Sequence, residues 1–284
     1  MPAMDQKISV FLINLDSSTD RLRHMQSELD RVDLSFERVP GILASALPAS
    51  LREYFCDGAG AIVAPLKLGE VGCFAAHLSV HRRLAEANED GLAALILEDD
   101  AKLPDNLTDI LSSLLRTLPP QWDVVRLSNP PKRAYVPIAR VDGQHQLVRY
   151  SKIPNFATAY LLSASGARKL VRPGLRVHAF DEYLRRPWLN GLDTFGVVPA
   201  PITENVFQST IDAVEPRKPG RANVLAKSIR KSDFRNLVGR ISFDVSTLGP
   251  ARWAGCLLVN LADKPAKRLF RRTLIHRSAL WLKY

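Results

Sequence analysis

Residues 92–100 have the sequence LAALILEDD, in which six apolar residues are followed directly by three acids. A continuous apolar run of this length is typical of a buried strand in a parallel sheet. Ligands of open α/β sheets bind at the carboxyl ends of the strands, which is where Glu98, Asp99 and Asp100 would lie. This stretch therefore predicts both the fold class and the place of a functional site.

The segments around this stretch alternate between strand and helix patterns. Residues 8–15, ISVFLINL, predict another buried strand, and apolar residues recur at helical spacing over 16–32. We expect further strands at 34–41, 122–127, 157–162 and 195–199, further helices at 69–87, 104–118 and 163–171, a long loop with one helical turn at 43–66, and a loop or hairpin at 130–151. This order indicates an α/β protein with a mostly parallel sheet.

Length and composition exclude several classes of protein. The chain has 284 residues, of which 46% are hydrophobic and 24% charged, so it is neither wholly disordered nor fibrous. Its three cysteines (Cys56, Cys73 and Cys256) are too few and too widely spaced for a disulfide framework or a four-cysteine zinc site. The first apolar run predicts a strand rather than a signal peptide, and no run reaches 18 apolar residues. We therefore expect a protein of the reducing cytoplasm.

Charge divides the chain into two parts. Residues 217–284 hold 16 Lys and Arg against three Asp and Glu, whereas the preceding residues are slightly acidic in total. We therefore expect one domain over 1–214 and a basic extension over 215–284, in which basic and apolar residues alternate as in amphipathic helices. Such an extension predicts an anionic partner: a membrane surface, a nucleic acid or an acidic substrate. An ordinary solvated surface is the alternative.

The three adjacent acids suggest a cation. Carboxylates repel one another at neutral pH, and Mg²⁺ or Mn²⁺ together with substrate phosphates would compensate for their charge. If strand geometry continues past the apolar run, Glu98 and Asp100 share one face and Asp99 takes the other. The alternative is a set of helix-capping acids ahead of Pro104.

Two further groups are candidates for chemistry. His77 and His81 are four residues apart on a predicted helix, a spacing found in zinc sites, but the glutamate of a metalloprotease motif is missing between them. We therefore expect His77 to form hydrogen bonds beside a pocket, near Glu70. Asp181, which follows an apolar pair, is either a general base or a helix cap, and spacing alone favours the cap.

Several motifs together resemble a known family. They are the INLD of the first strand with Asp20-Arg21, then GEVGC at 69–73 with His77, then LILEDD at 95–100, AYLLS at 159–163 with GARKL at 166–170, and Asp181 ahead of LRRPW at 184–188. In this order they resemble glycosyltransferase family 25, the bacterial lipopolysaccharide and oligosaccharide transferases related to collagen galactosyltransferases. The resemblance covers about residues 7–212, and the basic extension lies outside it.

This resemblance implies a GT-A-like fold with a mixed sheet, a UDP-sugar donor (usually UDP-galactose), a Mn²⁺ or Mg²⁺ ion, and transfer with inversion. It also implies roles for individual residues. Asp100 would bind the metal, Asp99 would be a second ligand or ribose contact, and Glu98 would bind the ribose or a donor hydroxyl. The nucleotide would lie near Asn14, Asp16 and Arg21, the helix with Glu70 and His77 would face it, and Asp181 would be the base.

The sequence thus predicts a metal-dependent inverting glycosyltransferase that acts on lipopolysaccharide or another cell-surface glycan. The basic extension would hold it as a peripheral protein on the cytoplasmic face of the inner membrane. Two alternatives remain: a non-enzymatic protein that binds an anionic surface or a nucleic acid, and a metal-dependent nucleotidyl or phosphoryl transferase that uses the same acids.

Overall fold

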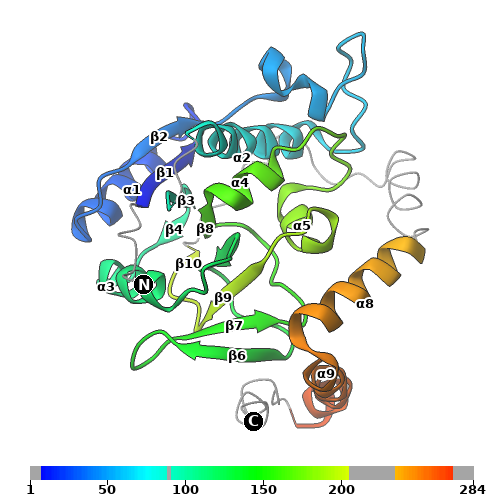
Figure 1. Ribbon diagram of the computed structural model, residues 1–284. Helices are drawn as coiled ribbons and strands as arrows, with labels where there is room; N and C mark the ends of the chain where they lie inside the picture. The colour runs from blue at the N-terminus through cyan, green and yellow to red at the C-terminus, as the bar shows by residue number, and fades with distance from the viewer. Residues whose placement is uncertain (1–7, 88–90, 205–233, 271–284) are drawn as a thin grey trace.

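The computed structural model describes residues 8–87, 91–204 and 234–270 (Figure 1). Its centre is an eight-stranded sheet with the order β2-β1-β3-β8-β5-β9-β7-β6. The strands are β1 (Ile8–Asn14), β2 (Glu37–Pro40), β3 (Ala93–Glu98), β5 (Val124–Arg126), β6 (Tyr135–Arg140), β7 (Gln146–Tyr150), β8 (Ala159–Ser163) and β9 (Thr194–Val198). The run at 92–97 thus forms a strand inside the sheet, as predicted.

The sheet is mixed, and most of its strands run in one direction. Strand β1 is parallel to both β2 and β3, and β5 is parallel to β9. Strand β8 lies antiparallel between β3 and β5, and β7 lies antiparallel between β9 and β6. The α/β class and the mostly parallel sheet are therefore confirmed, and the segment at 130–151 is the hairpin β6–β7.

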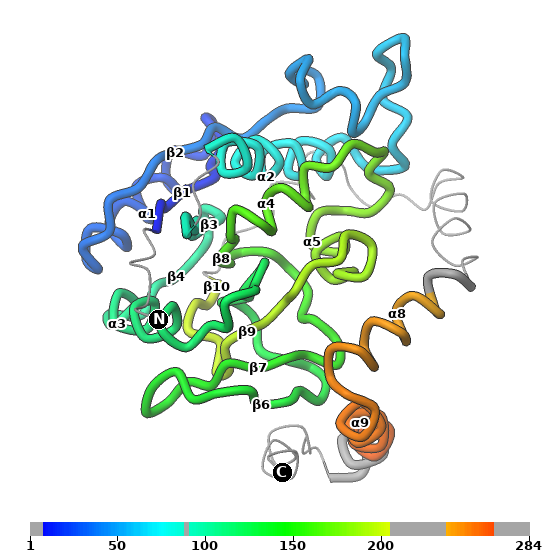
Figure 2. The backbone as a smooth tube through the Cα atoms, in the orientation of Figure 1, coloured from blue at the N-terminus to red at the C-terminus, as the bar shows by residue number. Residues whose placement is uncertain are grey.

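Helices cover both faces of the sheet (Figure 2). One face packs against α2 (Leu68–Glu86), α4 (Ala164–Leu170) and α5 (Phe180–Leu184), with Phe74, Leu78 and Phe180 fully buried in the core. The other face packs against α1 (Thr19–Arg31) and α3 (Leu107–Thr117) through Met25 and Leu111. Ser163 is the N-cap of helix α4, and its hydroxyl accepts a hydrogen bond from the Gly166 N–H. Successive β3 side chains alternate between the two cores, as the strand period requires.

Short elements complete the fold and differ in detail from the predictions. The segment at 43–66 contains two 3₁₀ helices, η1 (Ala44–Ala46) and η2 (Ala49–Tyr54), where one helical turn was expected. A third, η3 (Pro187–Leu189), follows α5. Strands β4 (Ala101–Lys102) and β10 (Thr203–Glu204) pair antiparallel beside the main sheet. Neither was predicted, because two residues show no periodic pattern.

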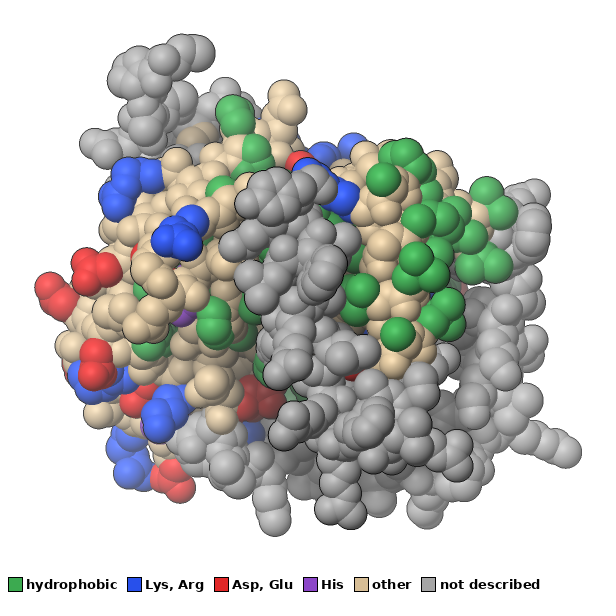
Figure 3. Space-filling view, turned by 90° about the horizontal axis from the view of Figure 1, so that it is seen from below, with side chains coloured by type: hydrophobic (Ala, Val, Ile, Leu, Met, Phe, Trp, Pro, Cys, Tyr) green, Lys and Arg blue, Asp and Glu red, His purple; other side chains and the backbone are tan. Residues whose placement is uncertain are grey.

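Two helices of the C-terminal region are α8 (Phe234–Leu248), which lies beside η3, and α9 (Pro250–Phe270), which lies beside β6. Leu248 and Cys256 pack against Ala134 and Val136. Other apolar side chains of these helices are exposed, namely Leu237, Val238, Ile241, Leu257, Leu258 and Leu261, and apolar groups gather on this side of the molecule (Figure 3). The remaining parts of the predicted basic extension, 215–233 and 271–284, lie outside the described residues. No helix within the described ranges is long and apolar enough to cross a membrane.

Candidate functional site

The acids that end β3 lie at one edge of the sheet, together with residues from the neighbouring strands. Strand β8 begins at this edge, because Leu97 pairs with Ala159, and β5 ends there, because Arg126 pairs with Tyr160. Glu98 is thus close to the start of β8 and the end of β5. Asn14, the last residue of β1, lies at the same edge, since Ile13 pairs with Glu98.

Asp99 joins β3 to the end of β1 and the start of α1. Its Oδ2 accepts a 2.8 Å hydrogen bond from Asn14 Nδ2, and its Oδ1 forms a 2.5 Å ion pair with Arg21. Arg38 on β2 donates from Nε to the Asn14 side-chain oxygen at 3.0 Å and pairs with Asp16 at 2.5 Å. Of the predicted nucleotide residues, Asn14 and Arg21 therefore contact Asp99 directly. Asp16 instead pairs with Arg38, an additional cation that the sequence analysis missed.

Asp100 has an unsatisfied oxygen. Its Oδ1 is buried and lacks a hydrogen-bond partner among the described residues. Burial and the negative charge of Glu98 raise the pKa of Asp100 to about 7. A buried carboxylate oxygen without a donor is unfavourable unless a proton or a cation neutralises it. This oxygen therefore fits a divalent cation.

Glu98 points to the opposite face of the sheet from Asp99, toward α2. Its Oε1 lies 3.2 Å from His77 Nε2. Burial and the charge of Asp99 raise the pKa of Glu98 to about 7, whereas burial and the charge of Arg126 lower the pKa of His77 to about 3. His77 is therefore neutral near pH 7, and its Nε2–H donates to Glu98 when that carboxyl is ionised.

A buried chain of hydrogen bonds fixes His77 in this role. The Tyr160 hydroxyl lies 2.9 Å from His77 Nδ1 and 2.8 Å from His81 Nε2, and the Phe180 ring stacks on His77 at 3.8 Å. When His77 donates from Nε2 to Glu98, its Nδ1 accepts from Tyr160, and Tyr160 accepts from His81. The two histidines thus hold a tyrosine hydroxyl between them, which the zinc interpretation of their spacing did not anticipate.

Cys73 Sγ, a nitrogen of His77 and a carboxylate oxygen of Glu98 lie within 4.8 Å of one another, close enough to share a metal ion. Burial and the charge of Glu98 raise the pKa of the Cys73 thiol well above its usual range. A thiol binds metal as the thiolate. The protonated thiol makes this group a weaker candidate than Asp100 for the cation.

Asp181 lies in the first turn of α5 and faces the same site. Its Oδ1 accepts a 2.7 Å hydrogen bond from the Glu182 N–H, and its Oδ2 accepts a 3.4 Å bond from the Phe156 N–H. Its negative charge contributes to the raised pKa of Glu98. Its carboxylate therefore binds local N–H groups close to Glu98, although the N-cap position of α5 is Ala179, and the role of general base stays a prediction.

Two other acids, Glu70 and Glu204, accept hydrogen bonds from neighbouring residues. The Glu70 carboxylate accepts a 2.9 Å hydrogen bond from the Lys67 N–H and caps α2. Glu204 on β10, which the sequence analysis missed, accepts hydrogen bonds from Thr158 Oγ1 at 2.9 Å and Asn129 Nδ2 at 3.0 Å. Its charge also raises the pKa of Glu98 and Asp100. Glu204 is thus a further acid of this edge.

Arg126 is the most unusual residue of the site and was also missed. It is fully buried at the end of β5. Its Nη2 donates to the Asn155 carbonyl at 3.4 Å, while its Nε and Nη1 lack partners among the described residues. Glu98 and Asp181 lie near enough to favour its charged form, although burial lowers its pKa. The sequence signal was an arginine inside an otherwise apolar strand.

Comparisons with known proteins relate this chain to one family of enzymes. A family model described as glycosyltransferase family 25 (LPS biosynthesis protein) matches residues 7–180. Procollagen galactosyltransferase 1-B of Xenopus laevis is 30% identical over 189 residues, which cover 62% of this chain and 30% of that protein. A glycosyltransferase 25 family member of Anopheles gambiae is 25% identical over 190 residues, which cover 62% of this chain and 31% of that protein.

Not all of the relatives carry the name of an active enzyme. Inactive glycosyltransferase 25 family member 3 of Homo sapiens is 30% identical over 191 residues, covering 62% of this chain and 31% of that protein. The chain therefore spans about a third of the length of these relatives. Among solved structures, the inositol-1-phosphate CTP transferase from T. maritima aligns with 81% of this chain and 98% of its own, at 10% identity and a TM-score of 0.29. That similarity is too low to relate the two proteins.

Proposed function

Because the chain belongs to glycosyltransferase family 25, we propose that it transfers a sugar from a nucleotide-sugar donor to a hydroxyl group of a glycan acceptor. The observation that carries the proposal is the buried, unpartnered Oδ1 of Asp100 beside Glu98, at the end of β3. A divalent cation at this oxygen would neutralise it and would also bind a diphosphate.

Mn²⁺ or Mg²⁺ fits the residues present. Asp100 would hold the ion, and Asp99 would be a second ligand or a ribose contact. The bound ion would stabilise, as a Lewis acid, the negative charge that forms on the departing diphosphate. Arg21 and Asn14 already hold both oxygens of Asp99 and thereby fix the orientation of this carboxylate.

The donor is proposed to be UDP-galactose, and two observations support it. Some of the relatives are named procollagen galactosyltransferases. Asn14 ends β1, Asp16 follows it, and Arg21 lies in the first turn of α1, beside the acids, where a nucleotide would contact them. Glu98, which lies 3.2 Å from the neutral His77, would accept a hydrogen bond from the ribose or a donor hydroxyl. His77 is part of α2, and Glu70 caps the start of this helix.

The proposed base is Asp181. Two backbone N–H groups orient its carboxylate, so it would remove the proton of the acceptor hydroxyl as that oxygen attacks the anomeric carbon. Attack opposite to the leaving diphosphate inverts the anomeric centre. General base catalysis of this kind contributes about 10²–10⁴ in rate.

The proposed acceptor is lipopolysaccharide or another cell-surface glycan, in accordance with the description of the matching family. The proposed location is the cytoplasmic face of the inner membrane. The exposed apolar side chains of α8 and α9 and the basic residues after 216 support contact with an anionic bilayer. Flotation with anionic and neutral liposomes tests this contact, and equal binding to both would contradict its electrostatic part.

A transfer assay with a panel of nucleotide sugars tests the main proposal. We expect Mn²⁺-dependent release of UDP from one UDP-sugar and loss of that release in Asp100→Asn. Asp105→Asn is the matched control, because the exposed Asp105 pairs with Arg31 outside the site. Nucleotidyl or phosphoryl transfer from the same panel would favour the alternative enzyme class, and unchanged release in Asp100→Asn would remove Asp100 from the site.

A further inference from the structure

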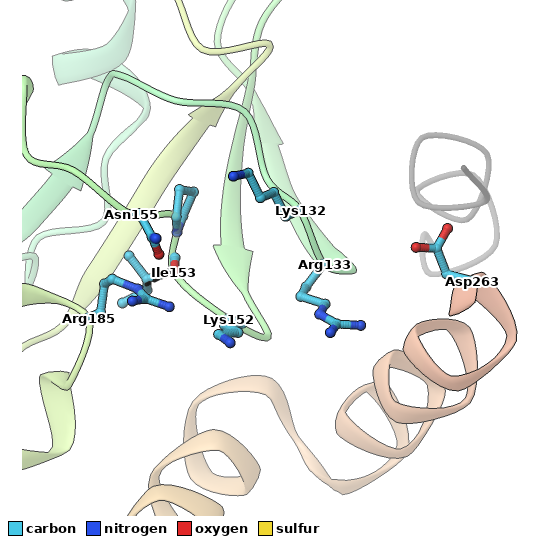
Figure 4. A pocket seen from close by; sticks show the side chains of 8 residues that line it. Lys132, Arg133, Lys152, Ile153, Asn155, Arg185 and Asp263 are labelled. Carbon is cyan, nitrogen blue, oxygen red and sulfur yellow. Dashed lines mark hydrogen bonds between the residues drawn. The ribbon is translucent and has the colours of Figure 1, made fainter. Parts of the chain in front are cut away.

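A pocket lined mainly by basic residues lies beside the loop that follows β7. This pocket of about 400 Å³ is bordered by Lys132 and Arg133 ahead of β6, Lys152 after β7 and Arg185 after α5 (Figure 4). We call this cavity the basic pocket, after these four side chains. Asp263 of α9 is the single acid among the eight described residues that line the pocket. The lining therefore carries a strong excess of positive charge.

The four cations of the basic pocket have no acidic partner within 8–87, 91–204 and 234–270. Across the described residues, none of the four cations of the basic pocket forms an ion pair; Arg133 donates to the Asn260 carbonyl at 3.5 Å and Arg185 to the Ile153 carbonyl at 3.1 Å. Burial and the positive charges of Arg185 and Arg240 lower the pKa of Lys152. Like charges gathered at one opening repel one another, and an anionic ligand relieves this repulsion.

The pocket and the active site share one wall. We call residues 152–156 the dividing loop. On one side its Lys152, Ile153 and Asn155 line the pocket. On the other side the Asn155 carbonyl accepts a hydrogen bond from Arg126, and the Phe156 N–H donates one to Asp181. A ligand in the pocket is therefore one short loop away from the proposed base.

We infer that the basic pocket binds a phosphate monoester of the acceptor and thereby brings the acceptor hydroxyl to Asp181. This inference rests on the proposed function and names its acceptor class, a phosphorylated sugar. A phosphate monoester carries a charge of about −1.5 to −2 and three acceptor oxygens, which matches several cations better than a single carboxylate does. Arginine adds planar, bidentate recognition of phosphate. The donor diphosphate is assigned to the other side of the dividing loop, beside Asp100.

Calorimetric titration of the full chain with a hexose 6-phosphate tests the inference. We expect the wild type to bind the sugar phosphate but not the unphosphorylated hexose. The double variant Arg133→Gln/Lys152→Gln should bind it about ten- to a hundredfold more weakly, because two charge-assisted contacts are lost. Arg140→Gln, which removes an exposed cation of β6 outside the pocket, should bind like the wild type, and Lys152→Arg should retain most of the affinity.

The outcomes separate this inference from the proposed function. Mn²⁺-dependent UDP binding should be unchanged in the double variant, whereas Asp100→Asn should lose UDP binding and keep hexose phosphate binding. Equal hexose phosphate affinity in the wild type and the double variant would overturn the inference. Competition between hexose phosphate and UDP would overturn it too, since the pocket would then be part of the donor site. Binding to phosphatidate vesicles without binding to the soluble sugar phosphate would assign the phosphate to a lipid and contradict the acceptor role.

Discussion

The acids at the end of β3 and the basic pocket lie on opposite sides of the dividing loop and carry opposite charge. On one side, burial and neighbouring acids raise the pKa values of Glu98 and Asp100 to about 7. On the other side, burial and neighbouring cations lower the pKa of Lys152. Asp99 pairs with Arg21, but among the described residues Asp100 Oδ1 has no hydrogen-bond partner and the four cations of the basic pocket form no ion pair. The comparison therefore supports the proposals of a cation at the acids and an anionic group in the basic pocket.

The largest expected effect concerns Asp181, which the dividing loop holds through Phe156. Asp181→Asn keeps the shape of the side chain but removes the base, so kcat for transfer should fall about 10²–10⁴-fold. Donor affinity should change little, because Asp181 is proposed to act on the acceptor. A parallel loss of UDP binding in titration would show that Asp181 contributes to donor binding. It would then contradict both the role of Asp181 as the base and the assignment of donor and acceptor to separate regions.

Arg126 connects the regions, because it donates to the dividing loop and lies near Glu98 and Asp181. Arg126→Met fills a similar volume without a buried charge, so the free energy of unfolding should stay equal or rise, although transfer should fall about ten- to a hundredfold. Denaturant unfolding and steady-state kinetics measure the two quantities. A large loss of stability together with normal transfer would make Arg126 a structural residue.

The hydrogen-bond chain behind Glu98 should matter for stability. Tyr160→Phe leaves His77 Nδ1 and His81 Nε2 buried without their shared partner, which should lower the free energy of unfolding by about 2–3 kcal/mol. Tyr150→Phe is the matched control, because the buried Tyr150 hydroxyl has no partner in the described part of the chain. If both substitutions lower the free energy of unfolding equally in urea, the hydrogen-bond chain of His77, Tyr160 and His81 does not stabilise the protein as proposed.

The smallest expected effect is a pH dependence. The folded state raises the pKa of Glu98 to about 7 from its ordinary 4.5, so above pH 4.5 the unfolded chain releases this proton more readily than the folded chain. Without metal, the wild type should therefore lose about 1 kcal/mol of stability per pH unit relative to Glu98→Gln as the pH rises from 4.5 to 7. The difference should then level off above pH 7. A difference that is constant with pH would contradict the raised pKa.

The sequence predicted the acidic half of this comparison better than the basic half. The apolar run at 92–97 and the INLD of β1 are local patterns, which predict two strands and place the acids at a carboxyl end. The family resemblance then implied that Asn14, Arg21 and Asp99 belong to one site, and the structure shows them in contact. The place of Asp181 came from the family resemblance, because spacing alone favoured a helix cap.

The residues that were missed depend on contacts between distant parts of the chain. Strand β8 lies antiparallel between β3 and β5, which brings Tyr160 to His77 and Arg126 to the site. Alternating strand and helix patterns do not specify the order of strands in a sheet. Glu204 comes from a strand of two residues, and the basic pocket gathers cations from three separate turns. Such groupings have no local signature.

The central claim is that the acids ending β3 bind a divalent cation that in turn binds a nucleoside diphosphate. Calorimetric titration of the full chain with UDP, in the presence and absence of Mn²⁺, tests it most directly. We predict binding with Mn²⁺, little or none without it, and loss of the Mn²⁺-dependent binding in Asp100→Asn but not in Asp105→Asn. UDP affinity that is the same with and without Mn²⁺, or that Asp100→Asn leaves unchanged, would contradict the claim.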